Sequence, residues 1–238
     1  MTVKISQLAN GLTVATDTML EAQSVALGIW VGVGTRDEPA EAQGVAHLVE
    51  HMLFKGTPTR DAKAISEAIE GVGGYINAYT SREETAYYVR VLPEHVDLAL
   101  DVLADMVQRS LLDETELTRE RDVIIQEIGQ AYDTPEDYIF DCAQEVAFPG
   151  QGIGWPILGQ AANIATMPRA RLQDYIGRLY NARNMIVVGA GALQHDQLLR
   201  LAERCFADLP AGQPVVRAAA AYHGGQRHEE RDLEQNHL

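Results

Sequence analysis

The hydrophobic and polar positions of the chain follow two different spacings, and each spacing predicts one kind of element. Apolar runs and alternating apolar positions, bounded by glycine, asparagine or proline, predict strands over 3–9, 12–16, 24–33, 75–80, 84–91 and 185–190. Apolar residues three and four positions apart, preceded by capping residues, predict helices over 44–54, 61–70, 93–109, 113–131, 136–147 and 195–207, with a further helix begun by Pro168. Because strands and helices come in runs rather than in strict alternation, we expect an α+β fold with a largely antiparallel sheet packed with helices.

Two parts of the chain are predicted to connect elements rather than to form them. Asn10 and Gly11 predict a two-residue hairpin turn between the first two strands, with positive φ at both residues. Beyond Pro210 the chain is rich in alanine, glycine and charged residues through Glu234 and shows no core-forming period. We therefore expect one folded domain over residues 1–212, followed by a linker within 213–238.

The predicted helix 44–54 contains the sequence HLVEH and has two different faces. At about 100° per residue, one stripe is apolar and the opposite stripe carries the polar groups and one aromatic ring. The apolar stripe consists of Val45, Leu48, Val49, Met52 and Leu53, and the other of His47, Glu50, His51 and Phe54. Histidines four residues apart can direct their imidazole nitrogens at one Zn²⁺, and a carboxylate between them can take a proton from a metal-bound water. The alternative is that these polar residues form the solvated face of an ordinary amphipathic helix, so a third ligand would be needed to favour a zinc site.

The predicted helix 113–131 supplies a candidate for that third ligand. Glu120 and Glu127 fall on the same stripe as Leu117 and Ile124. Two acids on a core-facing stripe destabilise the fold unless each meets a cation, a hydrogen-bond donor or a metal. One alternative is that they pair with arginines of the same helix, such as Arg119 or Arg121. The other is that one acid binds the metal and the second orients a ligand.

Composition narrows the classes of partner. The chain has 19 Lys and Arg against 34 Asp and Glu, a net charge of −15, which argues against a nucleic-acid partner and against anionic membranes and favours basic peptides. The two cysteines, Cys142 and Cys205, cannot form a thiolate zinc site alone and fit a reducing compartment in which both stay free.

The N-terminal sequence predicts the compartment. It lacks the basic and long apolar regions of a signal peptide, and no apolar run approaches the ~20 residues of a membrane span. We expect a cytoplasmic protein of bacterial type, or one of the mitochondrial matrix if a transit peptide was removed.

Three segments together resemble the N-terminal half of the pitrilysin/insulinase family of zinc metallopeptidases, close to the mitochondrial processing peptidase branch. They are HLVEHMLFKGT, GGYINAYTSREET and RERDVIIQEI, and they occur in the family's order and spacing over nearly the whole chain. The HxxEH pattern with a distant glutamate is the inverzincin arrangement. The resemblance implies that His47, His51 and Glu127 bind zinc, that Glu50 is the general base and that Glu120 is a second acid behind the site.

The same resemblance implies a substrate-binding surface. Asn77, Ala78 and Tyr79 are expected on an edge strand that pairs with an extended peptide, although an interior strand is the alternative. Phe54 is expected in a pocket for the residue after the scissile bond, or else in the core. Asp137 and Asp141 are expected to attract an arginine of the substrate, or else to form a solvated acidic helix face.

Family members of this branch have two homologous halves that enclose a clam-shaped cavity. The residues from Glu230 to Leu238 resemble the opening strand of the second half, so we expect 213–238 to comprise a linker and the start of a truncated second domain. The partners implied are the missing C-terminal half or a homologous subunit, with self-association into a homodimer as a further expectation.

Two functions from different classes follow. The first is a zinc endopeptidase of the processing type, whose isolated 238-residue chain is expected to be inactive. The second is a non-catalytic partner or scaffold subunit, as some relatives have become. All four positions of the zinc motif are intact here, which favours the enzyme.

Overall fold

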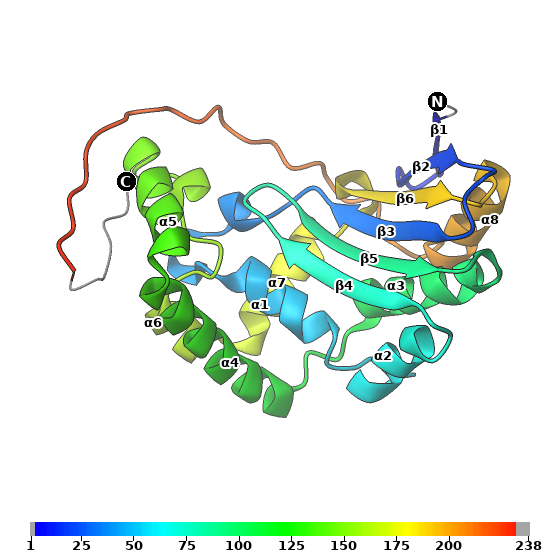
Figure 1. The fold of residues 1–238 in the computed structure, drawn as a ribbon, viewed down its shortest axis with the longest axis horizontal. Coiled ribbons are helices and arrows are strands. Elements are labelled where there is room, and N and C mark those ends of the chain that lie inside the picture. Colours follow the sequence, from blue (N-terminus) through cyan, green and yellow to red (C-terminus); the bar gives the residue numbers. More distant parts are fainter. Residues whose placement is uncertain (1–2, 232–238) are drawn as a thin grey trace.

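A six-stranded sheet forms the centre of the fold, with its strands in the order β1-β2-β6-β3-β5-β4 (Figure 1). The computed structural model describes residues 3–231. The strands are β1 (Val3–Gln7), β2 (Thr13–Thr18), β3 (Val25–Val31), β4 (Tyr75–Thr80), β5 (Thr85–Val91) and β6 (Met185–Gly191). All the pairings are antiparallel except that between β2 and β6, so the α+β, largely antiparallel prediction is confirmed.

Eight α-helices lie within the described part of the chain. They are α1 (Val45–Leu53), α2 (Ala62–Glu70), α3 (Val96–Arg109), α4 (Glu114–Asp133), α5 (Pro135–Ala147), α6 (Ala161–Thr166), α7 (Arg169–Leu179) and α8 (His195–Cys205). Figure 1 shows them gathered on one side of the sheet, with α3 and α8 beneath the strands and α1 beside β4. None of the helices in residues 3–231 combines the length and the hydropathy needed to cross a membrane.

Alternation along the strands decides which side chains enter the core. On β3, Leu27, Ile29 and Val31 are buried on the helix side, where they join a continuous apolar cluster with Leu48 of α1 and Leu100 of α3. Burial of each such side chain stabilises the fold by about 1.5–3 kcal/mol. The helix that carries the HLVEH sequence is therefore attached to the sheet through its apolar stripe.

The predicted hairpin turn at Asn10 and Gly11 is wrong in its geometry. Only Gly11 has positive φ, and the connection is a longer loop, in which the Leu8 amide donates to the Leu12 carbonyl at 2.8 Å and the Gly11 amide donates to the Leu8 carbonyl at 2.9 Å. The Asn10 side chain donates to the carbonyl oxygens of Phe206 and Leu209, at the end of α8. Its side-chain oxygen accepts a hydrogen bond from the amide of Leu12 at 3.1 Å, so Asn10 joins the local turn to the end of α8. The short helix α6 was also not predicted, because it occupies only six residues between two connections.

The segment after α8 forms no helix or strand as far as the description extends, from Pro210 to Arg231. It crosses from the sheet to α5, as the orange and red trace in Figure 1 shows, and its residues contact both regions. The predicted boundary at residues 212 and 213 stays a prediction, and residues 232–238, which belong to the predicted second domain, lie outside the described residues.

Candidate metal centre

The loop before α1 fixes where this helix begins. The buried carboxyl group of Glu38 accepts hydrogen bonds from the amides of Gly44 and Ala46, both at 2.8 Å, and so caps the first turn. Gly44 has a φ of 95°, and a Cβ there would lie 2.9 Å from the carbonyl oxygen of Leu158. A side chain at this position would therefore meet both backbone strain and a steric clash.

Helices α1 and α4 bring three candidate ligands together. Glu127 Oε2 lies 3.8 Å from His47 Nε2 and 3.7 Å from His51 Nε2, and the three ligand atoms all lie within 4.8 Å of one another. These distances are too long for hydrogen bonds but suit atoms arranged around a common centre. Among the described residues 3–231, these three are the histidine, cysteine or acidic side chains whose possible ligand atoms lie this close together.

The chemistry of these three residues fits a zinc ion. Burial, with a smaller contribution from His51, lowers the pKa of His47 from 6.5 to about 3, so its imidazole is neutral and has a lone pair to donate. Two imidazoles and one carboxylate form a ligand set found in catalytic zinc sites, which keep a fourth position open. His47 Nδ1 is buried without a hydrogen-bond partner in the described structure. Of the two histidines, it is therefore His51 whose second ring nitrogen, the one that points away from the cluster, has a partner.

That contact comes from Glu120, which lies seven residues, about two helical turns, before Glu127 on α4. Its carboxylate lies 2.9 Å from His51 Nδ1 and 2.7 Å from Lys55 Nζ, and its side chain is only 7% exposed. The arginines proposed as alternative partners are engaged elsewhere, Arg119 with Glu116 and Arg121 with the Met167 carbonyl. Glu120 therefore contacts a candidate ligand through one oxygen and a cation through the other.

Glu50 lies between the two histidines along α1 and beside the cluster. The hydroxyl of Thr80, the last residue of β4, donates a 2.6 Å hydrogen bond to Glu50 Oε2. Burial raises the pKa of Glu50, the Thr80 bond and His51 act against that shift, and Glu127 adds to it. Such an environment favours a carboxylate that takes up a proton readily.

The predicted substrate-binding residues of β4 lie on an edge strand, since β4 pairs with β5 alone in the sheet. The amide of Ala78 donates to the side-chain oxygen of Asn77 at 2.8 Å. The hydroxyl of Tyr79 donates to Glu84 and accepts from Trp30. A peptide pairing with this edge would replace the contact between Asn77 and Ala78.

The remaining predicted site residues, Phe54, Asp137 and Asp141, lie in three different environments. Phe54 follows the last turn of α1 and is partly buried against the apolar cluster. Asp137 is exposed on α5, whereas Asp141 accepts a 2.8 Å hydrogen bond from Arg82. The structure therefore places Asp141 beside an internal cation that a substrate arginine would have to displace. Their roles toward a substrate stay predictions.

Sequence reasoning did not identify Lys55, Thr80 or Glu38, which contact the site or its helix. Lys55 follows the second histidine by four residues, so helical spacing could have placed it on the same face. Thr80 and Glu38 come from other elements, and no local spacing relates them to α1.

Comparison with known proteins connects this geometry to a family. The chain matches the insulinase family, described as peptidase family M16, over residues 13–161, and a domain described as "peptidase M16 inactive domain" over residues 166–238. An uncharacterized zinc protease from Rickettsia felis is 42% identical over 98% of this chain and 57% of its own length. The mitochondrial-processing peptidase subunit beta of Saccharomyces cerevisiae is 39% identical over 90% of this chain and 46% of its own length. The chain spans about half the length of the curated relatives it matches.

Solved structures show the same fold at lower identity. A peptidase M16 inactive domain structure from Pseudomonas fluorescens gives a TM-score of 0.86 at 20% identity, covering 93% of this chain and 54% of the other. A periplasmic protease from Escherichia coli gives 0.82 at 24% identity, covering 93% of this chain and 25% of the other.

Proposed function

The chain belongs to the insulinase family of peptidases, peptidase family M16, and on this basis we propose that it carries the zinc-binding and general-base groups of a processing-type endopeptidase. The observation that carries the proposal is the convergence of His47, His51 and Glu127, with Glu50 beside them. These three residues would hold the zinc ion. A zinc ion bound there would supply Lewis-acid activation of water and of the peptide carbonyl group.

The chain's own residues then have separate tasks in peptide hydrolysis. Glu50 accepts the proton of the attacking water, and Thr80 holds the Glu50 carboxylate in place. Glu120 holds the His51 ring in the orientation that leaves Nε2 directed at Glu127. The open edge of β4 pairs with the backbone of an extended peptide, with Asn77, Ala78 and Tyr79 along it.

Selection of the substrate is proposed to depend on charge. The acids proposed to form a negative wall beside the site are Glu120, Asp133, Glu136, Asp137 and Asp141, in a chain whose net charge is −15. A negative wall attracts basic peptides and raises their rate of encounter. Asp137 and Asp141 are proposed to receive an arginine of the substrate, Asp141 by exchanging Arg82 for it.

A complete active site also needs donors for the oxyanion. Loss of one such donor costs about 10²–10³ in rate, so a zinc site and a base without them hydrolyse peptides poorly. We propose that a second homologous half supplies these donors, in the same chain or as a partner subunit, and that residues 213–238 connect to it. The names of relatives that are subunits of processing peptidases, and solved structures about twice this length, support this organisation.

A second function has one observation in its favour. Residues 166–238 match the domain described as inactive, which also suits a non-catalytic partner subunit. The intact His47, Glu50, His51 and Glu127 support the enzyme instead, because a scaffold has no use for a base beside a metal site.

The experiment that separates the two compares one basic peptide substrate across three samples: the chain alone, the chain extended by a homologous second half, and a mixture of the two halves. Each sample is prepared as wild type and as Glu50→Gln, with metal content measured by elemental analysis. We expect one zinc per chain in both forms, hydrolysis only where the second half is present, and a loss of about 10²-fold or more in Glu50→Gln. Zinc without any hydrolysis above the Glu50→Gln background would favour the scaffold.

A further inference from the structure

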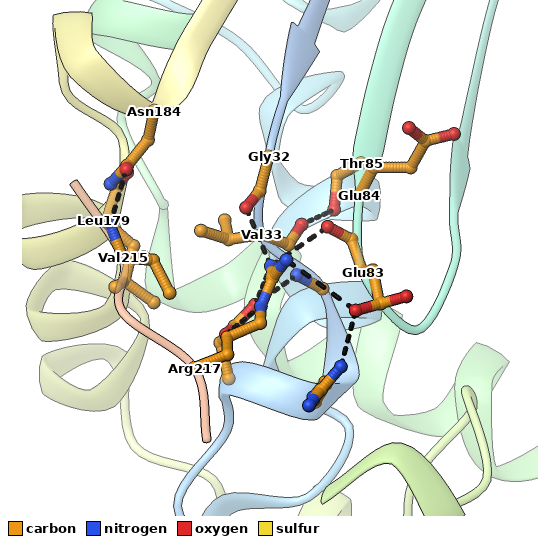
Figure 2. Close-up of polar contacts among 12 residues, drawn as sticks. Gly32, Val33, Glu83, Glu84, Thr85, Leu179, Asn184, Val215 and Arg217 are labelled. Carbon is orange, nitrogen blue, oxygen red and sulfur yellow. Dashed lines mark hydrogen bonds and ion pairs between the residues drawn. The ribbon is translucent and has the colours of Figure 1, made fainter. Parts of the chain in front are cut away.

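The segment after α8 was predicted to be a linker, but residues 213–217 are attached to the folded domain. We call them the clasp segment. The amide of Val215 donates to Asn184 Oδ1 at 2.8 Å, and the Val215 side chain packs against the apolar cluster. Val216 is 91% exposed, so the side chains alternate between the domain and solvent as on an extended strand. Figure 2 shows Val215 and Arg217 directed at the domain.

Arg217 makes the most extensive contacts of this segment. Its guanidinium binds both carboxylate oxygens of Asp37, at 2.8 and 2.6 Å. It also donates to the carbonyl oxygens of Gly32 at 2.7 Å and Glu83 at 3.0 Å, both labelled in Figure 2. The Asp37 side chain is only 6% exposed. Paired hydrogen bonds between a guanidinium and a carboxylate are among the stronger polar contacts, and their geometry is specific to arginine.

One route leads from Arg217 to the candidate metal helix through Asp37. This carboxylate also accepts the amide of Gly34, and so holds the turn that contains it. The next residue, Glu38, caps the first turn of α1 through Gly44 and Ala46. Arg217 therefore holds the turn from Gly34 to Asp37. Glu38, which follows this turn directly, holds the start of α1.

A second route leads to Glu50 through the turn between β4 and β5. Arg217 binds the carbonyl of Glu83 in that turn, and Arg36 binds the Glu83 carboxylate at 2.6 Å. Three residues before Glu83, Thr80 donates to Glu50. The guanidinium thus contacts three places: the end of β3 at Gly32, the loop before α1 at Asp37 and the turn between β4 and β5 at Glu83.

We propose that Arg217 is a positioning residue for the metal centre, through which the clasp segment holds α1 and the end of β4 in register. The proposal rests on the proposed metal site for its effect on zinc. Its structural part concerns the metal-free chain and can be tested separately. Without the guanidinium, the nearly buried Asp37 carboxylate loses its cation, and the two loops lose their common partner.

The first test is hydrogen exchange of the metal-free chain, followed by mass spectrometry. We expect Arg217→Gln to accelerate exchange about tenfold over residues 44–53 and 80–84, since local opening there no longer breaks the guanidinium contacts. The matched control is Arg227→Gln, which removes another arginine of the same C-terminal region that pairs with Glu145 and Glu229. Its effect should be confined to the region around α5. Unchanged exchange over 44–53 and 80–84 in Arg217→Gln would overturn the proposal.

Further variants identify the contact itself. Asp37→Asn should accelerate the same segments, and the double variant with Arg217→Gln should add little, because both changes break one interaction. Arg217→Lys keeps the charge but not the paired hydrogen bonds, so an intermediate effect is expected. If Arg217→Gln does not fold, Arg217→Lys is judged by the same criterion. Fully additive effects of the two single changes would show that they act independently and contradict the proposal.

Zinc affinity, measured by competition with a chelator, tests the connection to the metal. Arg217→Gln should bind zinc about three- to tenfold more weakly than wild type, a smaller effect than loss of a group that contacts a ligand. Equal affinities of the two proteins would refute the role at the metal centre. If the wild-type chain binds no zinc at all, the proposed metal site is wrong, and hydrogen exchange alone decides whether Arg217 positions α1.

Discussion

The Nδ1 atom of His51 lies 2.9 Å from a carboxylate oxygen of Glu120, while Nε2 of the same ring lies 3.7 Å from Glu127. Lys55 Nζ lies 2.7 Å from the other oxygen of Glu120, and a carboxylate oxygen acts as a hydrogen-bond acceptor. The proton of the neutral imidazole therefore belongs on Nδ1, and Nε2 is left as a donor of electrons toward the cluster. Glu120 thus determines which ring nitrogen of His51 is available to bind a metal.

The first prediction concerns this contact. Glu120→Gln should weaken zinc binding about 10- to 100-fold, because the amide is a poorer acceptor for Nδ1 and loses the pairing with Lys55. Chelator competition measures the affinity. Glu116→Gln, which changes an acid one turn earlier on α4 that pairs with Arg119, is the control and should bind zinc normally. Equal affinity in both variants would remove Glu120 from the site.

The second prediction concerns the ligands themselves. His47→Ala or His51→Ala should abolish stoichiometric zinc binding, since two protein ligands are too few for a catalytic site. Elemental analysis of the purified variants gives the result directly. His223→Ala, at an exposed histidine of the C-terminal segment, should retain one zinc. Full zinc content in both cluster variants would contradict the assignment.

The third prediction concerns Thr80. Thr80→Val keeps the shape of the side chain but removes the hydroxyl that donates to Glu50, so the carboxylate loses its orienting contact. In the extended two-half protein we expect hydrolysis to fall by about tenfold, with zinc content unchanged. Thr118→Val removes a hydroxyl from the exposed face of α4 and should have no such effect. A parallel loss of zinc in Thr80→Val would mean that the contact maintains the fold instead of the base.

The fourth prediction is a pH dependence of stability. Burial raises the pKa of Glu38 from 4.5 to about 8, against the effect of its two backbone hydrogen bonds. Between these values the folded chain binds the proton and the unfolded chain does not, so the free energy of unfolding should fall as pH rises and level off above about 8. Urea denaturation of the metal-free chain measures this. Glu38→Gln should lack this fall, and Glu41→Gln, at an exposed neighbour, should keep it. A fall that persists in Glu38→Gln would assign it to another group.

The fifth prediction concerns substrate charge. In the two-half protein, basic peptides should be cleaved faster than acidic peptides of equal length at low ionic strength, and the difference should shrink as salt screens the acidic wall. Matched peptides assayed over a salt series measure it. Because Arg82 pairs with Asp141, Arg82→Gln should increase the preference. Equal cleavage of both peptides at low salt would exclude charge selection.

Most of the helices and strands, and the faces of the two helices that carry the candidate ligands, follow from local sequence patterns. The stripe of α1 is a local property, because a helix places residues three and four apart on one side whatever surrounds it. The unexpected acids on α4 were visible for the same reason. Turn geometry was less certain, as Asn10 shows, because its side chain bonds to the carbonyls of Phe206 and Leu209 as well as to the amide of Leu12 in the local turn.

The surroundings of the candidate ligands, in contrast, depend on contacts between distant parts of the chain. Thr80 beside Glu50, and Glu38 at the start of α1, join elements whose separation in the chain follows no periodicity. The attachment of residues 213–217 is the clearest case. A segment without an apolar period predicts a linker, since one buried valine and one arginine form no pattern. What holds it is the set of acceptors that the folded domain presents to Arg217, and these come from two separate parts of the chain, the stretch from Gly32 to Asp37 and the turn that contains Glu83.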